Sequence, residues 1–553
     1  MTGPLRAAEC ASIGYPKPAS QHGSRPITAG AVLATVVLAV LAYGCLPSSW
    51  ETQETAEPAA SARADAGAAA ETAAPAASAT SEPLAPAATV RDCSPQDAAN
   101  DLAIDTADAV LASVQISRAL YDCADEIGLA FADDAEAILT LTARGIRGPL
   151  LLIESWSAAE PMTAVPMAEL QRLAPERIVA AGLNEQRLAQ RLAGFEVEWV
   201  PVNPTAALPH REAPHQRVWI VSGTERAAVL GAIGRQVHAA AVPVAAGEDL
   251  RALPEAEREM LRDAALVELH ADLGPDAAWQ LEVIRRGDEV PGGGLLMFEP
   301  GRARRLVAMY GHPATSQLGV LGEQDPSEGV ARLASIAQGY DADGADVVLA
   351  FEIIATVASA RAGRDGDYSN ETALDDIRPW IEAAAANDMY VVLDLQSGRT
   401  DFLTQAKHYE EFLRLPHVGL ALDPEWRLRP GEVHLQQIGT VDAAEVNQVV
   451  RWLAGLVREE ALPQKLLILH QFRFSMITNR ELVETPAELA VMIHMDGQGP
   501  INTKFSTWNA LTGEPDAHRF YWGWKNFYDE DFPTPTAEQV LAQTPSPLFV
   551  SYQ

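Results

Sequence analysis

Basic residues are scarce in this sequence, which holds 41 Lys and Arg against 75 Asp and Glu among 553 residues. The formal net charge at pH 7 is therefore −34. A surface this acidic repels phosphate backbones and anionic headgroups, which argues against binding of nucleic acid, and against adhesion to anionic lipid or teichoic-type polymers by charge alone. The composition suits a neutral or cationic partner, or serves solubility alone.

Motifs for several common kinds of chemistry are also missing. The chain has no Gly-rich phosphate loop between a strand and a helix, no Ser nucleophile elbow, no zinc-binding helix motif and no catalytic Cys arrangement. We therefore expect no cofactor. The hydrophobic share of 48% with 21% charged residues is that of a folded protein, and the length predicts two or more domains.

Long uncharged apolar runs are rare, and the most prominent lies near the N-terminus at Ile27–Tyr43, after several basic residues. This pattern predicts a signal segment or membrane anchor within residues 1–45. The run ends in Leu41-Ala42-Tyr43-Gly44-Cys45, which resembles a bacterial lipoprotein box. That resemblance implies cleavage and lipidation at Cys45, while an uncleaved anchor or ordinary secretion remain alternatives. Each alternative exports the rest of the chain.

Residues 46–90 are rich in Ala, Pro, Thr, Ser and Glu and almost lack large apolar side chains. Such a segment buries too little surface to offset its chain entropy, so we expect a disordered tether. Beyond it, Cys93 and Cys123 form an even pair in an exported region, which predicts a disulfide. We expect a helix at Ala98–Leu120 between them.

Residues 91–295 contain a helix-and-strand pattern that recurs after about 90 residues. The first copy includes Gly148–Leu152 and Pro175–Gly182, and the second includes Ala241–Val244 and Ala265–Leu269. The first copy resembles the cell-wall-binding repeat 2 family, which implies non-covalent adhesion to wall polysaccharide or peptidoglycan. The alternative is that both copies are packing modules that support the next domain.

Residues 300–553 contain eight apolar runs, most of them separated by gaps long enough for a helix. Because strands buried on both faces give such runs, the pattern predicts a (β/α)8 barrel after a flexible boundary at Pro291–Arg305. The overall fold class is thus α/β: a disordered tether, two α/β modules and a C-terminal barrel. The expected strands are Leu306–Tyr310, Val347–Ile353, Tyr390–Leu395, Val418–Leu422, Leu466–Leu469, Val491–Met495, Phe520–Trp522 and Leu548–Val550.

Barrels of this kind carry their chemistry at the C-terminal ends of the strands, and polar residues follow most of these runs. Asp423 and Glu425, two apart after the fourth run, can perturb each other's proton affinity and supply an acid for glycoside cleavage. We therefore assign catalysis to Glu425 as acid, with Asp423, Asp394 and Glu352 beside it. The expected substrate-binding residues are His312, Gln396, Trp426, His470, Gln471, Asp496, Trp522 and Trp524.

The segment Gly419–Glu425 resembles the end of the fourth strand of chitinase-type (family 18) glycosidases, where an Asp-x-Glu supplies the acid. The resemblance implies that Glu425 is this acid and that Asp496 corresponds to the Asp after the sixth strand. Ala421 stands where the family has a further Asp, so the family's substrate-assisted mechanism does not carry over. A degenerate barrel that binds glycan without cleaving it is the alternative reading.

A metal-dependent hydrolase is the third hypothesis. Six possible metal ligands end five different expected strands, although no tight spacing such as His-x-His occurs, and we assign no metal. These residues are His312, Asp394, Asp423, His470, His494 and Asp496. The expected setting is the cell envelope, with the chain held at the membrane by its N-terminus and in contact with wall glycan.

Overall fold

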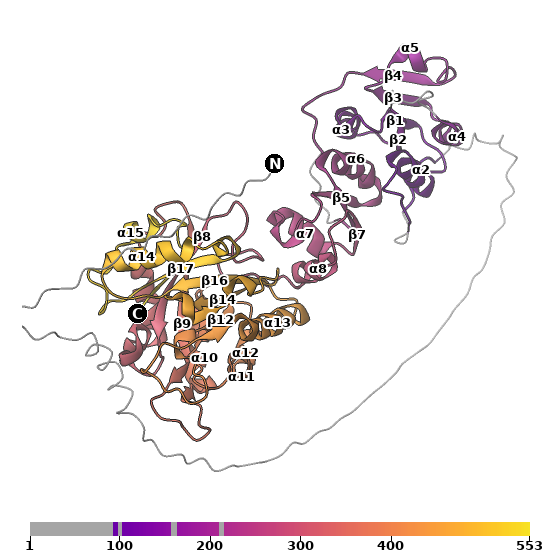
Figure 1. Ribbon diagram of the computed structural model, residues 1–553. Helices are drawn as coiled ribbons and strands as arrows, with labels where there is room; N and C mark the ends of the chain where they lie inside the picture. The colour runs from indigo at the N-terminus through magenta and orange to yellow at the C-terminus, as the bar shows by residue number, and fades with distance from the viewer. Residues whose placement is uncertain (1–91, 98–101, 156–162, 209–214) are drawn as a thin grey trace, which may run out of the picture.

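The computed structural model describes residues 92–97, 102–155, 163–208 and 215–553. The expected signal segment with Cys45 and the expected tether lie outside these residues. Within the described ranges, no helix combines the length and the apolar character needed to cross a bilayer. These ranges form two lobes, with α/β modules in one and a barrel in the other (Figure 1).

Eight parallel strands form a closed barrel in the C-terminal half, which confirms the predicted fold class. The ring closes between the last and first strands, where Phe549 pairs with Leu306. A short antiparallel strand, β10 (Ser369–Glu371), extends the ring at β9. The barrel strands are β8 (Arg304–Gly311), β9 (Asp346–Ala358), β11 (Tyr390–Leu395), β12 (Val418–Leu422), β14 (Lys465–His470), β16 (Leu489–Met495), β17 (Tyr521–Asn526) and β18 (Phe549–Tyr552).

Helices surround this ring. A loop rather than a helix precedes β16, which begins at Leu489. Two short strands, β13 (Val441–Asp442) and β15 (Ile477–Thr478), pair outside the barrel. The helices are α9 (Pro326–Ile336), α10 (Leu374–Ala386), α11 (Phe402–His408), α12 (Glu410–Leu413), α13 (Ala443–Glu459), α14 (Ile501–Thr512) and α15 (Ala537–Leu541).

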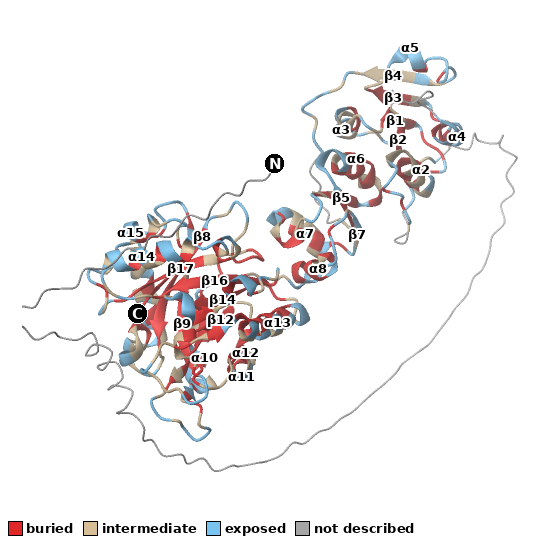
Figure 2. Cartoon of the chain, in the orientation of Figure 1, coloured by how far each residue is buried: buried red, intermediate tan, exposed pale blue. Residues whose placement is uncertain are grey.

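Alternate residues of the barrel strands face the interior, and the lower interior layers are apolar. Leu306, Ala308, Leu466 and Phe549 belong to one fully buried cluster inside the ring. Residues of opposite parity, such as Val307, pack with the surrounding helices in a second cluster. Burial on both faces explains why the strands are near-continuous apolar runs in the sequence (Figure 2).

The segment 291–305 plugs the N-terminal end of the barrel rather than forming the expected flexible boundary. Met297 is buried and packs with the interior cluster, and its backbone N–H donates to the Gln464 side chain at 3.0 Å. The Arg304 guanidinium, 2% exposed, donates to the carbonyl oxygens of Leu296 and Gly293. These contacts fix a Gly-rich segment whose composition alone predicts mobility.

The N-terminal lobe consists of two modules whose first three strands are arranged in the same order, which supports the predicted repeat. The first sheet is ordered β2-β1-β3-β4, with β4 as an additional edge strand, and the second is ordered β6-β5-β7, all parallel. The first has β1 (Glu126–Phe131), β2 (Leu150–Ile153), β3 (Arg177–Ala181) and β4 (Glu196–Val200), with helices α3 (Ala135–Arg144), α4 (Ala164–Leu173) and α5 (Glu185–Leu188). The second has β5 (Arg217–Ser222), β6 (Ala239–Val244) and β7 (Leu266–His270), with helices α6 (Thr224–Gly234), α7 (Glu255–Asp263) and α8 (Ala277–Arg286).

Cys93 and Cys123 form the predicted disulfide. The helix between them, α2 (Ala109–Leu120), begins later than expected because Asp108 caps it, accepting from the N–H groups of Val110 and Leu111. Ser117 on this helix donates to the buried Glu169 of α4 at 2.6 Å. The disulfide and this contact attach α2 to the first module.

The second module packs against the N-terminal end of the barrel. Arg251 donates to the carbonyl oxygen of Ala487, just before β16, at 2.8 Å, and Arg458 at the end of α13 pairs with Asp276 at 2.6 Å. Both guanidinium groups lie 4.5 Å from the ring centroid of Trp279 on α8. The C-terminal end of the barrel therefore lies away from the modules.

Candidate active site

A layer of polar side chains crosses the barrel where its strands end. Inward-facing positions repeat every second residue, and the uppermost of these on all eight strands carry a titratable or hydroxyl group. Every member is at most 3% exposed. The polar layer consists of Tyr310, Glu352, Asp394, Asp423, His470, His494, Lys525 and Ser551.

His470 lies at the centre of this layer. Its Nδ1 atom is 3.0 Å from Asp496, and its Nε2 atom is 3.0 Å from Glu352 and 3.8 Å from Asp394. Burial alone would lower the pKa of His470, but the three carboxylates raise it well above its usual value. Burial would raise the pKa of Glu352, yet the neighbouring His494 and His470 lower it to about 2. The centre is therefore an ionised imidazolium–carboxylate network.

Tyr310 and Asp394 form the second contact of the polar layer. The tyrosine hydroxyl donates to Asp394 Oδ2 at 2.8 Å, while Asp394 Oδ1 has no hydrogen-bond partner among the described residues. Burial raises the pKa of Asp394 to about 6, because His470 offsets only part of the desolvation. The Lys525 ammonium lies 3.2 Å from the Tyr310 ring centroid. The Asp394 carboxyl group and the Lys525 ammonium, which acts to lower the Asp394 pKa, thus both contact Tyr310.

Asp423 and Glu425 lie where β12 passes into a short 3-10 turn, Pro424–Trp426. Asp423 is buried, and burial together with Glu425 and Asp394 raises its pKa well above its usual value. Glu425 is half-buried, and burial and Asp496 raise its pKa to about 7. Burial and nearby carboxylates therefore raise the pKa values of both neighbouring carboxyl groups, whereas their spacing in the sequence predicts that only one of them holds a proton.

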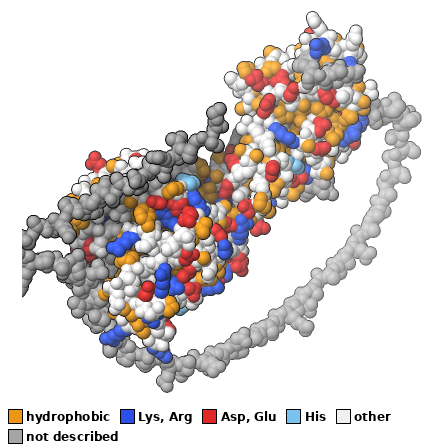
Figure 3. All heavy atoms as spheres, viewed as in Figure 1, with side chains coloured by type: hydrophobic (Ala, Val, Ile, Leu, Met, Phe, Trp, Pro, Cys, Tyr) orange, Lys and Arg blue, Asp and Glu red, His pale blue; other side chains and the backbone are white. Residues whose placement is uncertain are grey.

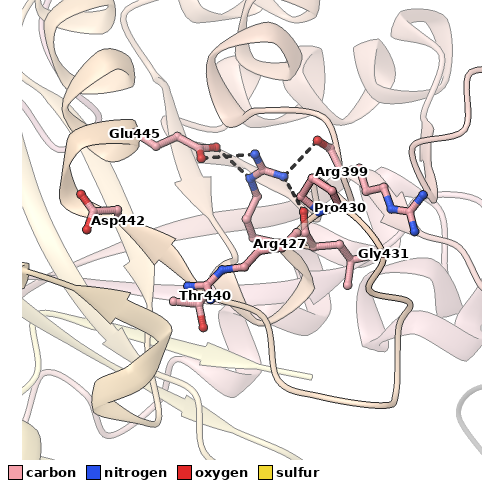
Figure 4. A pocket seen from close by; sticks show the side chains of 9 residues that line it. Arg399, Arg427, Pro430, Gly431, Thr440, Asp442 and Glu445 are labelled. Carbon is pink, nitrogen blue, oxygen red and sulfur yellow. Dashed lines mark hydrogen bonds and ion pairs between the residues drawn. The ribbon is translucent and has the colours of Figure 1, made fainter.

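Two cavities flank the segment that follows β12. The first, about 280 Å³, is lined by Glu425 and Trp426 together with residues of two later loops, and we call it the Glu425 cavity. Its other lining residues are His434, Leu435, Gln436, Gln437, Ile438 and Arg473. The second, about 450 Å³, lies on the other side and is called the arginine cavity (Figure 4). Its lining residues are Arg399, Arg427, Leu428, Arg429, Pro430, Gly431, Thr440, Asp442 and Glu445.

The structure brings together most of the residues predicted for the site. Glu352, Asp394, Asp423, His470 and Asp496 meet in or beside the polar layer, with Glu425 above them. Gln396 joins them, since its side chain lies 3.4 Å from the Tyr310 hydroxyl. Trp426 lines the Glu425 cavity, with its ring 5.4 Å from that of His434.

Other predicted binding residues lie apart from this group. His312 contacts Thr372 at 3.0 Å, and Gln471 accepts from Arg480 at 2.8 Å. Trp522 and Trp524, 5% and 0% exposed, face outward from β17 and pack on Trp508 of α14. This placement contradicts their expected role in binding a glycan, because helix α14 covers both rings.

Several residues of the layer escaped the sequence analysis. Lys525 and Ser551 did so because β17 and β18 continue beyond the expected Trp522 and Val550. Tyr310 lies two residues after Ala308 and four after Leu306, so its side chain faces the barrel interior as theirs do. This alternation is the sequence signal that could have identified it.

Glu352, His470 and His494 could hold a metal ion, since one ligand atom from each lies within 4.8 Å of the others. Glu352 Oε2 and His494 Nδ1 are buried without hydrogen-bond partners among the described residues. The two imidazole rings are stacked, however, with planes 8° apart and centroids separated by 5.0 Å. A metal lies in the plane of each ligating imidazole, so one ring would have to rotate.

Comparison with known proteins yields fold likeness only. No family model and no curated protein matches the chain. Among solved structures, the dihydropteroate synthase of Burkholderia cenocepacia, complexed with 7,8-dihydropteroate, is 14% identical, with 48% of this chain and 89% of that chain covered and a TM-score of 0.23. The enzyme of Stenotrophomonas maltophilia is 14% identical, with 46% and 88% covered and a TM-score of 0.22. That of Xanthomonas albilineans is 13% identical, with 46% and 89% covered and a TM-score of 0.20. Likeness of this size carries no argument about the reaction.

Proposed function

We propose that the barrel is a glycoside hydrolase in which Glu425 is the general acid. The observation that carries this proposal is the position of Glu425, whose carboxyl group has a pKa of about 7 and lines a cavity directly above the polar layer. A general acid works best when its pKa lies near the working pH and its proton reaches the substrate. Glu425 meets both conditions.

The proposed reaction uses groups of the site that differ in protonation. Protonated Glu425 donates its proton to the glycosidic oxygen as the bond from that oxygen to the anomeric carbon breaks. Carboxylates kept ionised by His470, namely Glu352 and Asp496, stabilise the positive charge that develops on the sugar. Water then adds to the anomeric carbon, and its proton restores Glu425. Burial and the nearby Asp496 carboxylate keep the Glu425 proton from leaving at neutral pH.

The proposed setting is the cell envelope, and the proposed substrate is a wall glycan such as peptidoglycan. This part of the proposal rests on the N-terminal sequence, with its signal-like run and Cys45, and on the repeat of α/β modules. The modules would adhere to wall polysaccharide while the lipidated or membrane-inserted N-terminus anchors the chain. Secretion of a tagged full-length chain, followed by fractionation of membrane and wall, tests this location.

The decisive test of the reaction is the Glu425→Gln variant. Cleavage of isolated wall glycan, measured as released reducing ends, should fall about 10²–10⁴-fold while the melting temperature is retained. Glu514→Gln is the matched control, because it makes the same change at an exposed residue of the barrel and should cleave like the wild type. Full activity in Glu425→Gln would overturn the proposal.

A non-catalytic glycan-binding barrel is the alternative favoured by Ala421. This residue lies inside the barrel below Asp423, where chitinase-type enzymes carry a further Asp, so the interior lacks that carboxylate. Under this alternative, the wild-type chain sediments with wall glycan and releases no reducing ends from any wall fraction.

A metal-dependent hydrolase is the other alternative, favoured by the unpartnered atoms of Glu352, Asp394 and His494. It requires stoichiometric metal in the purified full-length chain. Elemental analysis that finds metal in the wild type, but none in Glu352→Gln, would favour this alternative.

A further inference from the structure

Three arginines without a carboxylate partner among the described residues lie at the C-terminal end of the barrel, which we call its mouth. Most other arginines of the barrel pair with carboxylates, as Arg378 does with Glu411 at 2.7 Å, while Arg304 and Arg519 donate to carbonyl oxygens. Among the described residues, by contrast, no carboxylate forms an ion pair with Arg399, Arg429 or Arg473. All three follow the C-terminal ends of barrel strands. In a chain with a formal net charge of −34, a group of arginines without carboxylate partners favours an anionic ligand.

Arg473 belongs to the cavity of the proposed acid. It lies on the exposed loop after β14 and lines the Glu425 cavity opposite Trp426. Its guanidinium lies 5.6 Å from the Phe472 ring centroid, and this is its only side-chain contact within the described chain. An anionic group on a sugar in this cavity can therefore bind Arg473 without displacing another partner.

Arg399 and Arg429 line the neighbouring arginine cavity. Arg399 stacks over Tyr368 at 4.4 Å and donates to the carbonyl oxygen of Glu432 at 2.7 Å, while its Nε–H is buried without an acceptor among the described residues. The Arg429 side chain is exposed and forms no hydrogen bond or ion pair among the described residues. These two guanidinium groups retain free donors toward the cavity.

The lining of the arginine cavity holds three arginines and only two carboxylates, Asp442 and Glu445. Arg427 pairs with Glu445 at 2.9 Å and donates to the carbonyl oxygens of Arg399 and Leu428, as the dashed lines in Figure 4 show. It also donates to the carbonyl oxygen of Gly398. Asp442, the other carboxylate, caps α13 and accepts from Thr478 at 2.8 Å. The net charge that this cavity presents to a ligand is therefore positive.

One chain of contacts links the two cavities. Tyr368, beneath Arg399, accepts through its carbonyl oxygen from His434 at 3.0 Å, and His434 contacts Trp426 in the Glu425 cavity. A polymer bound in the Glu425 cavity can thus continue past His434 and Tyr368 into the arginine cavity. On the face drawn in Figure 3, acidic and basic side chains are instead interspersed.

We infer that the substrate is an anionic glycan, with a carboxylate or phosphate on the sugar held by Arg473 and a second anionic group held by Arg399 and Arg429. The inference rests on the proposed function and deepens it by naming the substrate class. Guanidinium groups suit this task, because their paired donors match carboxylate and phosphate oxygens. The acidic surface elsewhere repels the same polymer, which confines it to the mouth.

Binding of defined polymers to the full-length chain tests this inference. The probes are polygalacturonate, its carboxyl-reduced neutral derivative and poly(glycerol phosphate), measured by isothermal titration at low and at physiological salt. We expect an anionic probe to bind about tenfold or more tightly than the neutral one, with affinity falling as salt rises. Binding of polygalacturonate alone, or of the phosphate polymer alone, supports the inference and identifies the group. Equal binding of the neutral derivative overturns it.

The variants locate the site. Arg473→Ala and Arg429→Ala change exposed side chains, so their folding should persist, and each should weaken binding of the anionic probe about tenfold. Arg473→Lys should recover part of the loss, because it restores the charge without the fork of donors. The control is Arg451→Ala, at an ion pair whose arginine is 65% exposed on the outer helix α13, and it should bind like the wild type. Unchanged binding in both mouth variants overturns the inference.

The two proposals fail in different ways. If Glu425→Gln binds the anionic probe normally and the wild type cleaves no glycan, the hydrolase proposal fails while the anion site stands. If a neutral glycan is cleaved equally well by the wild type and by Arg473→Ala, the hydrolase proposal stands and the anionic substrate class is wrong.

Discussion

The Nδ1 atom of His470 lies 3.0 Å from the Oδ2 atom of Asp496, and both residues are buried in the mouth of the barrel. Through its other ring nitrogen, His470 reaches Glu352, so one imidazolium compensates carboxylates from two further strand ends. Buried charges are tolerated only when they are paired, and the stability of this site therefore depends on His470.

Removing this imidazolium should destabilise the chain. In His470→Ala the carboxylates of Glu352 and Asp496 lose their shared partner, which should lower the free energy of unfolding by about 3–5 kcal/mol. Urea unfolding followed by tryptophan fluorescence measures the change. The control, His518→Ala, alters an exposed histidine and should cost less than about 0.5 kcal/mol. Equal effects of the two substitutions would contradict a central role for His470.

The proposed activity should fall as pH rises through about 7. The pKa of Glu425 is raised to about 7 in the folded chain, so the acid form is present below this pH and is lost above it. The alkaline limb of kcat/KM for glycan cleavage should therefore show an apparent pKa near 7. Activity that increases steadily from pH 6 to pH 9 would argue that another group supplies the proton.

Lys465 should make the free energy of unfolding increase as the pH rises, whereas the proposed activity decreases. It is buried at the closed end of the barrel, donates to the carbonyl oxygens of Leu415 and Val418, and burial lowers its pKa from 10.5 to about 7. Between these values the unfolded chain binds more protons than the folded chain, so this residue makes stability increase with pH. The increase should disappear in Lys465→Met, measured as the difference between the two proteins in denaturant unfolding at pH 7, 8 and 9.

The disulfide should stabilise the first module. Cys93 and Cys123 enclose a loop with a sequence separation of 30 residues, and opening such a loop costs roughly 3–4 kcal/mol in the chain-entropy description. The double variant Cys93→Ser, Cys123→Ser should unfold at a lower temperature by calorimetry. Reductant should lower the wild-type transition by a similar amount and leave the double variant unchanged.

The barrel was predictable because its strands are buried on both faces. Runs such as Val418–Leu422 appear in the sequence with the bounds that the structure gives. Helix α14 was missed because Asn502, Thr503 and Lys504 interrupt its apolar pattern, and Lys504 is buried only because it pairs with Asp531 at 2.6 Å. Tertiary pairing of this kind leaves no periodic signal in the sequence.

The sequence predicted the site residues at each strand end separately, but not the contacts between residues of different strands. Asp423 and Glu425 are neighbours in the sequence, so the effect of Glu425 on the pKa of Asp423 could be anticipated, whereas Glu425 is perturbed by burial and by Asp496 of a different strand end. The distances from His470 to Glu352 and Asp496 depend on how the ring closes, and no local pattern encodes them. The arginines at the mouth could not be predicted for the same reason, because a sequence does not show which arginines form ion pairs with carboxylates.

The plug formed by residues 291–305 seals the end of the barrel on which the second module packs. The chain thus enters the barrel from its closed end, and its open end faces the opposite direction. Under the proposed function, the section of glycan bound to the modules and the section in the mouth are separated by the full depth of the barrel. The proposed enzyme would thus remain attached at one point on a glycan chain while it cleaves another.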